Sequence, residues 1–221
     1  MKVAVIIPAY NAAEYLNQLL AETLKQTNAR DILVIDDGSH DATRAIAESR
    51  GVKCLCHAHN RGKGMTLRTG FAQALARGYD AVITMDADGQ HDPKYIPTMI
   101  DNIKTGHWDI IIGSRRNNFE EMSFARFLSN SVTTVVVSLL SGRKIEDSQC
   151  GFRFIGRKVL ESLPLETNGY QMESELLIKA GRRGFRIGHI PIRTIASDSS
   201  HIKHLPDTAK FLVMAVKTLW V

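Results

Sequence analysis

The chain has 221 residues, 44% of them hydrophobic, and its 28 Lys and Arg outnumber its 23 Asp and Glu, for a formal net charge of +5 and a pI of about 9.2. This length and apolar content predict one compact domain with a buried core. The three cysteines, Cys54, Cys56 and Cys150, exclude a disulfide framework and a structural zinc site, because they form neither an even set nor a C-x-x-C pair.

The positive charge fits an anionic partner, such as a nucleotide or a phospholipid surface, and fits equally a basic surface that meets only solvent. Nucleic-acid binding is disfavoured, because no basic run has aromatic residues interleaved with it. The apolar run at residues 3–8 is too short for a signal peptide, and no window reaches the roughly 18 apolar residues of a spanning helix. We therefore expect a cytoplasmic protein.

Short β-branched runs alternate with helical patterns through the first half of the chain. Taken in order, strands are expected over 2–8, 31–39, 52–58, 79–88 and 108–115, and helices over 12–26, 41–50, 63–78 and 92–106. Asp41 is the expected N-cap of the second helix, and Asp92 that of the helix beginning at Pro93. The short links between strands and helices predict a parallel, doubly wound sheet covered by helices.

The second half of the chain, beyond Arg116, does not continue this alternation. A polar start leads into a long helical pattern within 117–142, followed by a turn entering a strand at 146–155, a helix at 173–184 and a strand at 185–195. No repeat or low-complexity linker divides the chain, so both halves are assigned to a single domain, 1–221.

Polar residues and glycines gather at the carboxyl ends of the expected strands, at 8–11, 36–39, 60–64, 86–88 and 113–115. Ligands of doubly wound sheets bind beyond these ends. A purely structural sheet does not need such residues there, so we expect a ligand site at this edge.

Asp86 and Asp88 are separated only by the small Ala87, and Gly89 permits a turn after them. Two carboxylates drawn toward one point repel each other, and the usual remedy is a divalent cation with hard oxygen ligands. Magnesium or manganese would then carry the phosphates of a nucleotide. The alternative is an Asp-rich turn that only caps the following helix.

Asp36 and Asp37 form a second acidic strand end. A carboxylate there can accept hydrogen bonds from a base edge or a ribose hydroxyl, and the alternative is a plain Asx turn. Neither G-x-G-x-x-G nor G-x-x-x-x-G-K-[ST] is present, so the dinucleotide fingerprint and the P-loop are both excluded.

Several segments together resemble one family: VIIPAYN, VIDDGSHDAT, NRGKG, MDADGQHDP, GSR and DSQCGFRFI, in this order and at similar intervals. The chain resembles family 2 glycosyltransferases with the GT-A fold, and within that family the polyprenyl-phosphate and dolichyl-phosphate mannosyl- and glucosyltransferases. The resemblance covers residues 1 to about 205.

The resemblance implies a GT-A fold, a mostly parallel Rossmann-like sheet flanked by helices with the nucleotide site at the C-terminal strand ends. Residues 1–116 would bind the nucleotide-sugar donor, and 117–221 would face the acceptor. The implied reaction is inverting transfer of a hexose from a donor of the GDP-mannose or UDP-glucose type, with Mg²⁺ or Mn²⁺, to a polyprenyl or dolichyl phosphate. A soluble saccharide acceptor and a non-catalytic nucleotide-binding domain remain as alternatives.

Family motifs also imply roles for individual residues. Nucleoside contacts fall on Pro8, Tyr10 and one or both of Asp36 and Asp37. The metal on the donor diphosphate falls to Asp86 and Asp88, with Gln90 close by. Phosphate contacts fall on Arg115 and Lys203, and the base or acceptor-orienting carboxylate is Asp147, with Arg153 steadying its segment. The implied catalytic residues are thus Asp147, Asp88 and Arg115.

Two departures from the family pattern concern the nucleotide, since Ala12 stands where a glutamate is usual and Ser197 where an arginine is usual. The acceptor determines how much Asp147 matters, because a phosphate is already ionised near neutral pH whereas a sugar hydroxyl needs a base. Glu173 and Glu175 are expected to diverge on their helix, one near the acceptor and one in solvent.

Two stretches are candidates for contact with a membrane surface, which a polyprenyl acceptor requires: 124–140, which carries Phe124, Phe127 and Leu128 near Arg126, and 211–220, which ends in Trp220. Packing on the sheet, or a contact between two copies of the chain, is the alternative for each stretch. A sugar-phosphate nucleotidyltransferase is disfavoured, because the first strand is not followed by a glycine-rich basic loop.

Overall fold

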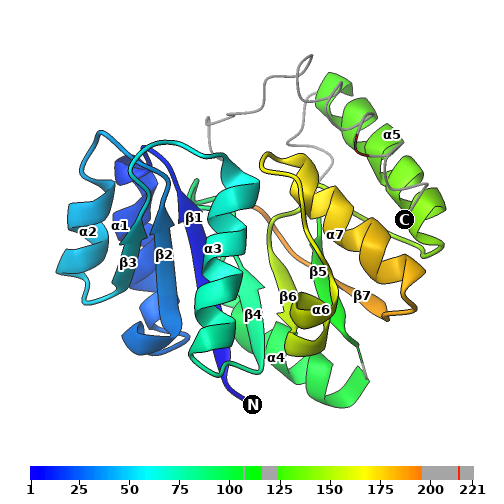
Figure 1. Ribbon diagram of the computed structural model, residues 1–221, viewed down its shortest axis with the longest axis horizontal. Helices are drawn as coiled ribbons and strands as arrows, with labels where there is room; N and C mark the ends of the chain where they lie inside the picture. Colours follow the sequence, from blue (N-terminus) through cyan, green and yellow to red (C-terminus); the bar gives the residue numbers. More distant parts are fainter. Residues whose placement is uncertain (107, 116–123, 196–213, 215–221) are drawn as a thin grey trace.

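The structure is a computed structural model that describes residues 1–106, 108–115, 124–195 and 214 (Figure 1). Its strands are β1 (Val3–Ala9), β2 (Ile32–Asp36), β3 (Lys53–Cys56), β4 (Ala81–Thr84), β5 (Ile110–Ser114), β6 (Arg153–Gly156) and β7 (Ile187–Pro191). Its helices are α1 (Ala13–Leu24), α2 (Thr43–Ser49), α3 (Lys63–Ala76), α4 (Tyr95–Gly106), α5 (Phe124–Ser141), α6 (Arg157–Ser162) and α7 (Gln171–Arg182), with a 3-10 turn η1 (Ala29–Asp31).

The strands form one sheet in the order β3-β2-β1-β4-β6-β5-β7. β6 runs antiparallel to β4 and β5, and the other pairs are parallel. The expected mostly parallel sheet is therefore confirmed. The strand order reverses at β1, which lies between β2 and β4, and such a reversal is where open α/β sheets bind ligands.

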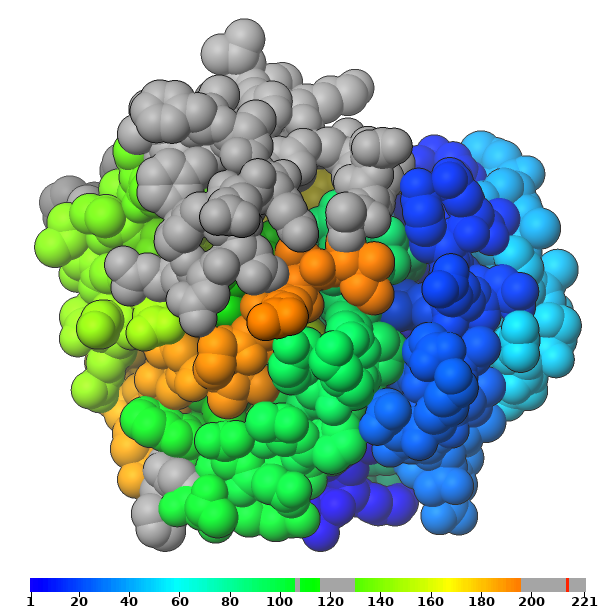
Figure 2. All heavy atoms as spheres, turned by 180° about the vertical axis from the view of Figure 1, so that it is seen from behind, coloured from blue at the N-terminus to red at the C-terminus, as the bar shows by residue number. Residues whose placement is uncertain are grey.

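The central strands consist mainly of apolar residues because helices cover both faces of the sheet. β2, β4 and β5 are buried along their whole length. α3 and α7 lie on the face turned toward the viewer in Figure 1, whereas α1 and α4 lie on the face seen in Figure 2. The core is thus two apolar layers, one on each side of the sheet.

The ends of several elements differ from the sequence-based expectation. β4 ends at Thr84, so Asp86 and Asp88 lie in the turn beyond it. α4 begins at Tyr95, and Asp92 accepts the amide of Lys94 in the turn before the helix at 3.0 Å instead of capping a helix at Pro93. α6 was not expected from the sequence, because its single short turn leaves no clear periodicity.

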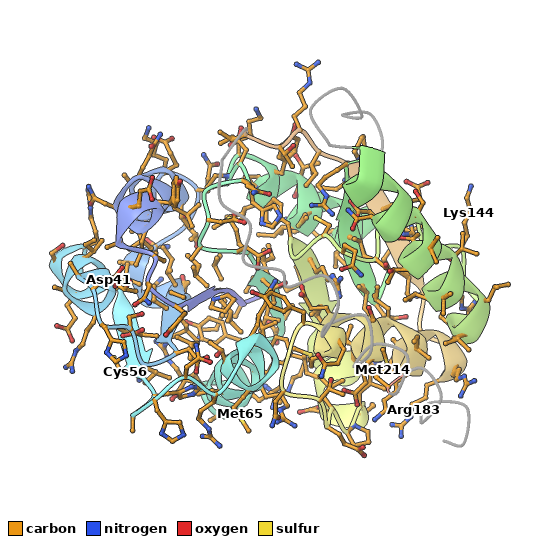
Figure 3. The ribbon with its side chains drawn as sticks, turned by 90° about the horizontal axis from the view of Figure 1, so that it is seen from above. Asp41, Cys56, Met65, Lys144, Arg183 and Met214 are labelled. Carbon is orange, nitrogen blue, oxygen red and sulfur yellow. The ribbon has the colours of Figure 1, made fainter. Side chains whose placement is uncertain are left out.

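Asp41 has a wider role than the expected cap of its own helix. Its Oδ1 accepts the amide of Thr43 at the start of α2, and its Oδ2 accepts the amide of Ala13 at the start of α1, both at 3.0 Å. Figure 3 shows Asp41 beside these two helices. One carboxylate therefore satisfies orphan amides at two helix starts.

α5 packs along α7 at the edge of the molecule, away from β3 (Figure 1). Gly181 makes this packing possible, since a Cβ there would overlap the carbonyl oxygen of Ser141. Within the described residues, no helix has both the length and the apolar content needed to cross a membrane.

Gly70 lets α3 lie directly on the sheet, because a Cβ at this position would be only 2.6 Å from Cγ2 of Ile6. We predict that Gly70→Val lowers the free energy of unfolding by about 1–3 kcal/mol through overpacking. Urea denaturation measures this. Ala72→Val, on the exposed side of the same helix, is the control and should change stability by less than about 1 kcal/mol. Equal losses in both variants would contradict the close packing.

Candidate functional site

The carboxyl ends of β1, β2, β4 and β5 meet at one edge of the sheet, as expected for parallel strands. The antiparallel β6 begins at this edge, because Arg153 pairs with Thr84 at the end of β4. The segment 147–152, which precedes β6, therefore lies beside the turn that carries Asp86. This antiparallel pairing brings together two motifs far apart in the sequence.

Asp86 is bound by a lysine of the protein itself. Nζ of Lys63, the first residue of α3, lies 2.6 Å from Oδ1 of Asp86 and 2.9 Å from Oε2 of Glu173 in α7. Burial raises the pKa of Asp86, but the ammonium of Lys63 outweighs it and brings the pKa to about 2. Burial lowers the pKa of Lys63, and the two carboxylates more than offset this, so its pKa lies above the usual range. Asp86 and Lys63 are therefore both charged near neutral pH.

His91 and Gly151 hold the backbone and carboxylate of Asp86 in place. Nδ1 of the buried His91 accepts the Asp86 amide at 3.2 Å, and the ring stacks on Phe152 with centroids 5.4 Å apart. Burial lowers the pKa of His91, which favours the neutral ring that this acceptor role requires. A Cβ at Gly151 would overlap the Asp86 carboxylate, so this position needs glycine.

Asp88 is the other carboxylate of the turn, and it is half-buried. Its Oδ1 accepts the amide of Gln90 at 3.0 Å, around Gly89, whose φ is +74°. Within the described part of the chain, no cation pairs with Asp88 and no donor reaches its second oxygen. Asp88 therefore keeps an oxygen that is available to a ligand.

Arg115 and Asp147 form a bidentate ion pair near this turn. Nε of Arg115 lies 2.7 Å from Oδ2 and Nη2 lies 2.9 Å from Oδ1 of Asp147. Burial raises the pKa of Asp147, but the hydrogen bonds and charge of Arg115 outweigh it and hold the pKa below its usual value. Asp147 is therefore a weak base that orients the guanidinium.

Arg153, among the largest fully buried side chains, ties the 147–152 segment to α7. Its guanidinium donates to the carbonyl oxygens of Ser148, Cys150 and Glu173, each at 2.7 Å. The steadying contact expected for Arg153 is present, and it reaches both segments that surround Asp86.

Asp36 and Asp37 differ in what they bind. Asp37 is fully engaged, because its oxygens accept from Nδ1 of His57 at 2.6 Å and from the amides of Arg61 and Gly62 at 2.9 and 2.8 Å. Asp36 uses Oδ1 for the amide and hydroxyl of Ser39. Its Oδ2 has no protein partner among the described residues, so only Asp36 keeps an oxygen for a ligand.

Pro8 and Tyr10 line the end of β1. Pro8 fits within this central strand because pairing with β4 stops at Ile6, so its missing amide hydrogen breaks no ladder on that side. Tyr10 is 42% exposed, and the next residue, Asn11, has a φ of +48°. An exposed aromatic ring at a turning strand end is a suitable surface for stacking a base.

The expectation that one of Glu173 and Glu175 lies in solvent was wrong, because both are buried. Glu173 pairs with Lys63, and Glu175 lies 2.7 Å from Nζ of Lys179 and accepts the amides of Glu166 and Thr167. The two carboxylates do diverge, as i and i+2 on a helix must, but each faces a different part of the interior.

The structure brings Asp86, Asp88, Arg115 and Asp147 to one edge, together with the ends of β1 and β2. Lys203 lies outside the described residues. Sequence reasoning missed Lys63 and His91 as members of this site. Lys63 did lie in a recognised strand-end segment, but nothing in the local sequence pairs it with Asp86, because the start of α3 and the turn after β4 come together only in the folded protein.

The charges of this edge fit a divalent cation. Counted with their ordinary charges, the three cations Lys63, Arg115 and Arg153 face the four carboxylates of Asp86, Asp88, Asp147 and Glu173, which leaves one net negative charge. An anionic diphosphate alone would be repelled by this excess. No group of three or more His, Cys, Asp or Glu in the described residues is arranged to hold a metal by itself. Magnesium and manganese sites built from one or two carboxylates plus substrate phosphates match this donor set.

Comparison with known proteins also relates the chain to enzymes that use nucleotide sugars. The family described as "Glycosyl transferase family 2" matches residues 4–164. The UDP-N-acetylglucosamine–dolichyl-phosphate N-acetylglucosaminyltransferase of Methanococcus voltae is 31% identical over 217 residues, which cover 88% of this chain and 86% of the relative. The undecaprenyl-phosphate mannosyltransferase of Micrococcus luteus is 29% identical over 214 residues, covering 92% and 87%.

Among solved structures, glucosyl-3-phosphoglycerate synthase of Mycobacterium tuberculosis, in complex with Mn²⁺, UDP and phosphoglyceric acid, superposes with a TM-score of 0.77. The match covers 99% of this chain and 77% of the other at 20% identity, so it establishes the GT-A fold alone.

We predict that Arg153→Met lowers the free energy of unfolding by at least about 2 kcal/mol, because a buried carbonyl left without its donor costs about 1–3 kcal/mol and the carbonyls of Ser148 and Cys150 both lose the guanidinium. Urea denaturation gives the value. Arg44→Met is the control, since Arg44 is exposed and among the described residues forms an ion pair only with Glu48 on its own helix. This variant should lose less than about 1 kcal/mol of stability. A similar loss in both variants would contradict the structural role of Arg153.

Proposed function

The chain belongs to glycosyl transferase family 2, and from this premise we propose that it transfers a hexose from a nucleoside-diphosphate sugar to a polyprenyl or dolichyl phosphate, with inversion at the anomeric carbon. The donor is of the GDP-mannose or UDP-glucose type. The named relatives act on dolichyl and undecaprenyl phosphates, which supports the lipid-phosphate acceptor.

The observation that carries this proposal is the bidentate pairing of Asp147 with Arg115. A sugar hydroxyl needs a base to remove its proton, and a carboxylate whose pKa is held below its usual value is poorly suited to that task. A phosphate oxygen is already ionised and attacks without such a base. The pairing therefore favours a phosphate acceptor over a saccharide.

Donor binding is assigned to the 1–116 half and acceptor binding to the 117–221 half. Pro8, Tyr10 and the open oxygen of Asp36 receive the nucleoside, while Asp37 holds the 57–62 loop that flanks it. Gln90 fixes the turn that carries Asp88 by donating its amide. Arg115 and Lys203 are assigned to the phosphates.

Asp88 is assigned as the main ligand of the metal and Asp86 as the additional one, because Asp86 already forms an ion pair with Lys63. When bound, Mg²⁺ or Mn²⁺ neutralises the charge that grows on the departing diphosphate. Arg115, oriented by Asp147, lies at the same edge and stabilises that charge as it develops.

The reaction replaces one carbon–oxygen bond at the anomeric carbon with another. An oxygen of the acceptor phosphate forms a bond to the anomeric carbon as the bond to the nucleoside diphosphate breaks on the opposite face. The leaving diphosphate takes the bonding electrons, and no proton has to move in this step. Residues that stabilise negative charge are therefore more important than residues that transfer protons.

We predict that Asp88→Ala reduces sugar transfer to below one tenth of wild type at saturating donor and leaves the fold intact. In thermal-shift assays, GDP or UDP should raise the melting temperature of the wild type only with Mn²⁺, and should not raise that of the variant. Asp92→Ala is the control, because among the described residues the Asp92 side chain bonds only to Lys94 in the next turn. A variant that keeps the metal-dependent shift would refute the assignment of Asp88.

We also predict that Asp147→Asn lowers transfer to a short-chain polyprenyl phosphate by less than about 100-fold, with the shape of the pH–rate profile unchanged, because orientation of Arg115 is weakened but no base is lost. Initial rates measured across the pH range provide the test. Asp109→Asn serves as the control, because within the described residues the Asp109 side chain bonds only to the amide and the guanidinium of Arg186. Loss of an acidic limb from the profile would show that Asp147 is a base and would favour a hydroxyl acceptor.

A further inference from the structure

The inward face of α5 carries hydroxyl groups. Oγ1 of Thr134 lies 3.0 Å from Oγ of Ser148, Oγ of Ser138 accepts the amide of Ile145 at 3.1 Å, and Oγ of Ser141 accepts the amide of Arg143 at 3.2 Å. Val137, on the same side, is fully buried. The polar atoms of this helix are thus used inside the protein.

The outward face of α5 carries aliphatic side chains. Val132 and Val135 are each 57% exposed and Leu139 is 76% exposed, and their spacing of three and four residues places them in one row. We call Val132, Val135 and Leu139 the α5 stripe. A helix at a protein surface normally turns its apolar side inward, so this reversed arrangement indicates that the stripe meets something other than water.

Basic residues follow directly at the C-terminal end of the helix. Arg143 and Lys144 are exposed, and within the described residues no ion pair joins either to a carboxylate. In Figure 3, Lys144 projects outward beside α5. Residues 130–144 contain no Asp or Glu. The stripe therefore continues into two exposed basic residues, and the next acidic residue, Glu146, is half-buried.

We propose that the α5 stripe, with Arg143 and Lys144, docks on an anionic lipid bilayer. Aliphatic side chains enter the boundary between headgroups and acyl chains, while the basic end meets lipid phosphates. This inference rests on the proposed function, since a polyprenyl phosphate is reached at a bilayer. A symmetric contact between two copies through the stripe would offer the basic ends no acidic partner from the same helix segment.

The docking surface is connected to the active site through the helix itself. Thr134, on the inward face, hydrogen-bonds Ser148, and Ser148 is adjacent to Asp147, which orients Arg115. Gly181 and Arg182 of α7 fix the end of α5, since the guanidinium of Arg182 donates to the carbonyl of Leu140 at 3.0 Å. A bilayer held against the stripe would therefore lie on the same rigid helix that supports the acceptor-side carboxylate.

Co-sedimentation of the whole chain with vesicles tests this. The wild type should bind vesicles of phosphatidylglycerol and phosphatidylcholine, and the triple variant Val132→Ser, Val135→Ser, Leu139→Gln should bind at least about tenfold more weakly. These exchanges keep helix propensity nearly constant, so an unchanged melting temperature shows that the fold is retained. Arg143→Glu with Lys144→Glu should remove the preference for phosphatidylglycerol.

The matched control for charge is Lys53→Glu with Lys158→Glu, which makes the same change in net charge on exposed residues away from α5 and should leave vesicle binding unchanged. Transfer to a soluble short-chain polyprenyl phosphate should be the same in the wild type and the α5 variants. If the wild type shows this transfer but does not bind vesicles, or binds as well after the triple exchange, the docking surface is wrong while the proposed function stands.

Two further outcomes separate the remaining possibilities. A wild type that binds vesicles through the stripe but transfers sugar to no lipid phosphate would support the surface and refute the proposed function. A wild-type dimer in size-exclusion chromatography that the triple variant converts to a monomer would overturn the bilayer assignment in favour of a second copy of the chain.

Discussion

A partly buried negative charge at Asp86 is the constraint on which the site depends. A carboxylate removed from water must be compensated by a cation or by hydrogen-bond donors. Lys63 supplies the cation, and because it also binds Glu173 it joins the start of α3 to α7. His91 holds the Asp86 amide and Gly151 leaves room for the carboxylate. Elements from both halves of the chain therefore fix the turn after β4.

The other charges of the site are ordered around this one. Arg115 is held by Asp147, and Asp88 is left with an open oxygen, so the edge has an excess of negative charge that a divalent cation can neutralise. An ion pair of this kind does more for orientation than for stability, because desolvation of both partners offsets much of their attraction. The same ion pair lowers the pKa of Asp147 and so makes it a weak base, which favours an acceptor that is already ionised.

α5 is amphipathic in the reverse of the usual sense, with hydroxyl groups turned inward and aliphatic side chains turned outward. Hydroxyls that would ordinarily face water are used to hold the segment next to Asp147, and the aliphatic side chains are turned outward. This distribution suits a helix that contacts a polar loop on one side and, as proposed, a bilayer on the other. The basic residues at its end match the sign of the lipid phosphates.

The sequence by itself determined the order and type of nearly all elements, because apolar runs and helical periodicity are local properties that burial in a layered sheet enforces. It also placed Asp36, Asp86, Asp88 and Arg115 at strand ends, since parallel strands share one edge. Only the tertiary structure decided that β6 is antiparallel, that Lys63 binds Asp86, and that Asp37 is engaged while Asp36 is open. Those outcomes depend on which strands become neighbours and which buried charges then need a partner, and neither is encoded in any short stretch of residues.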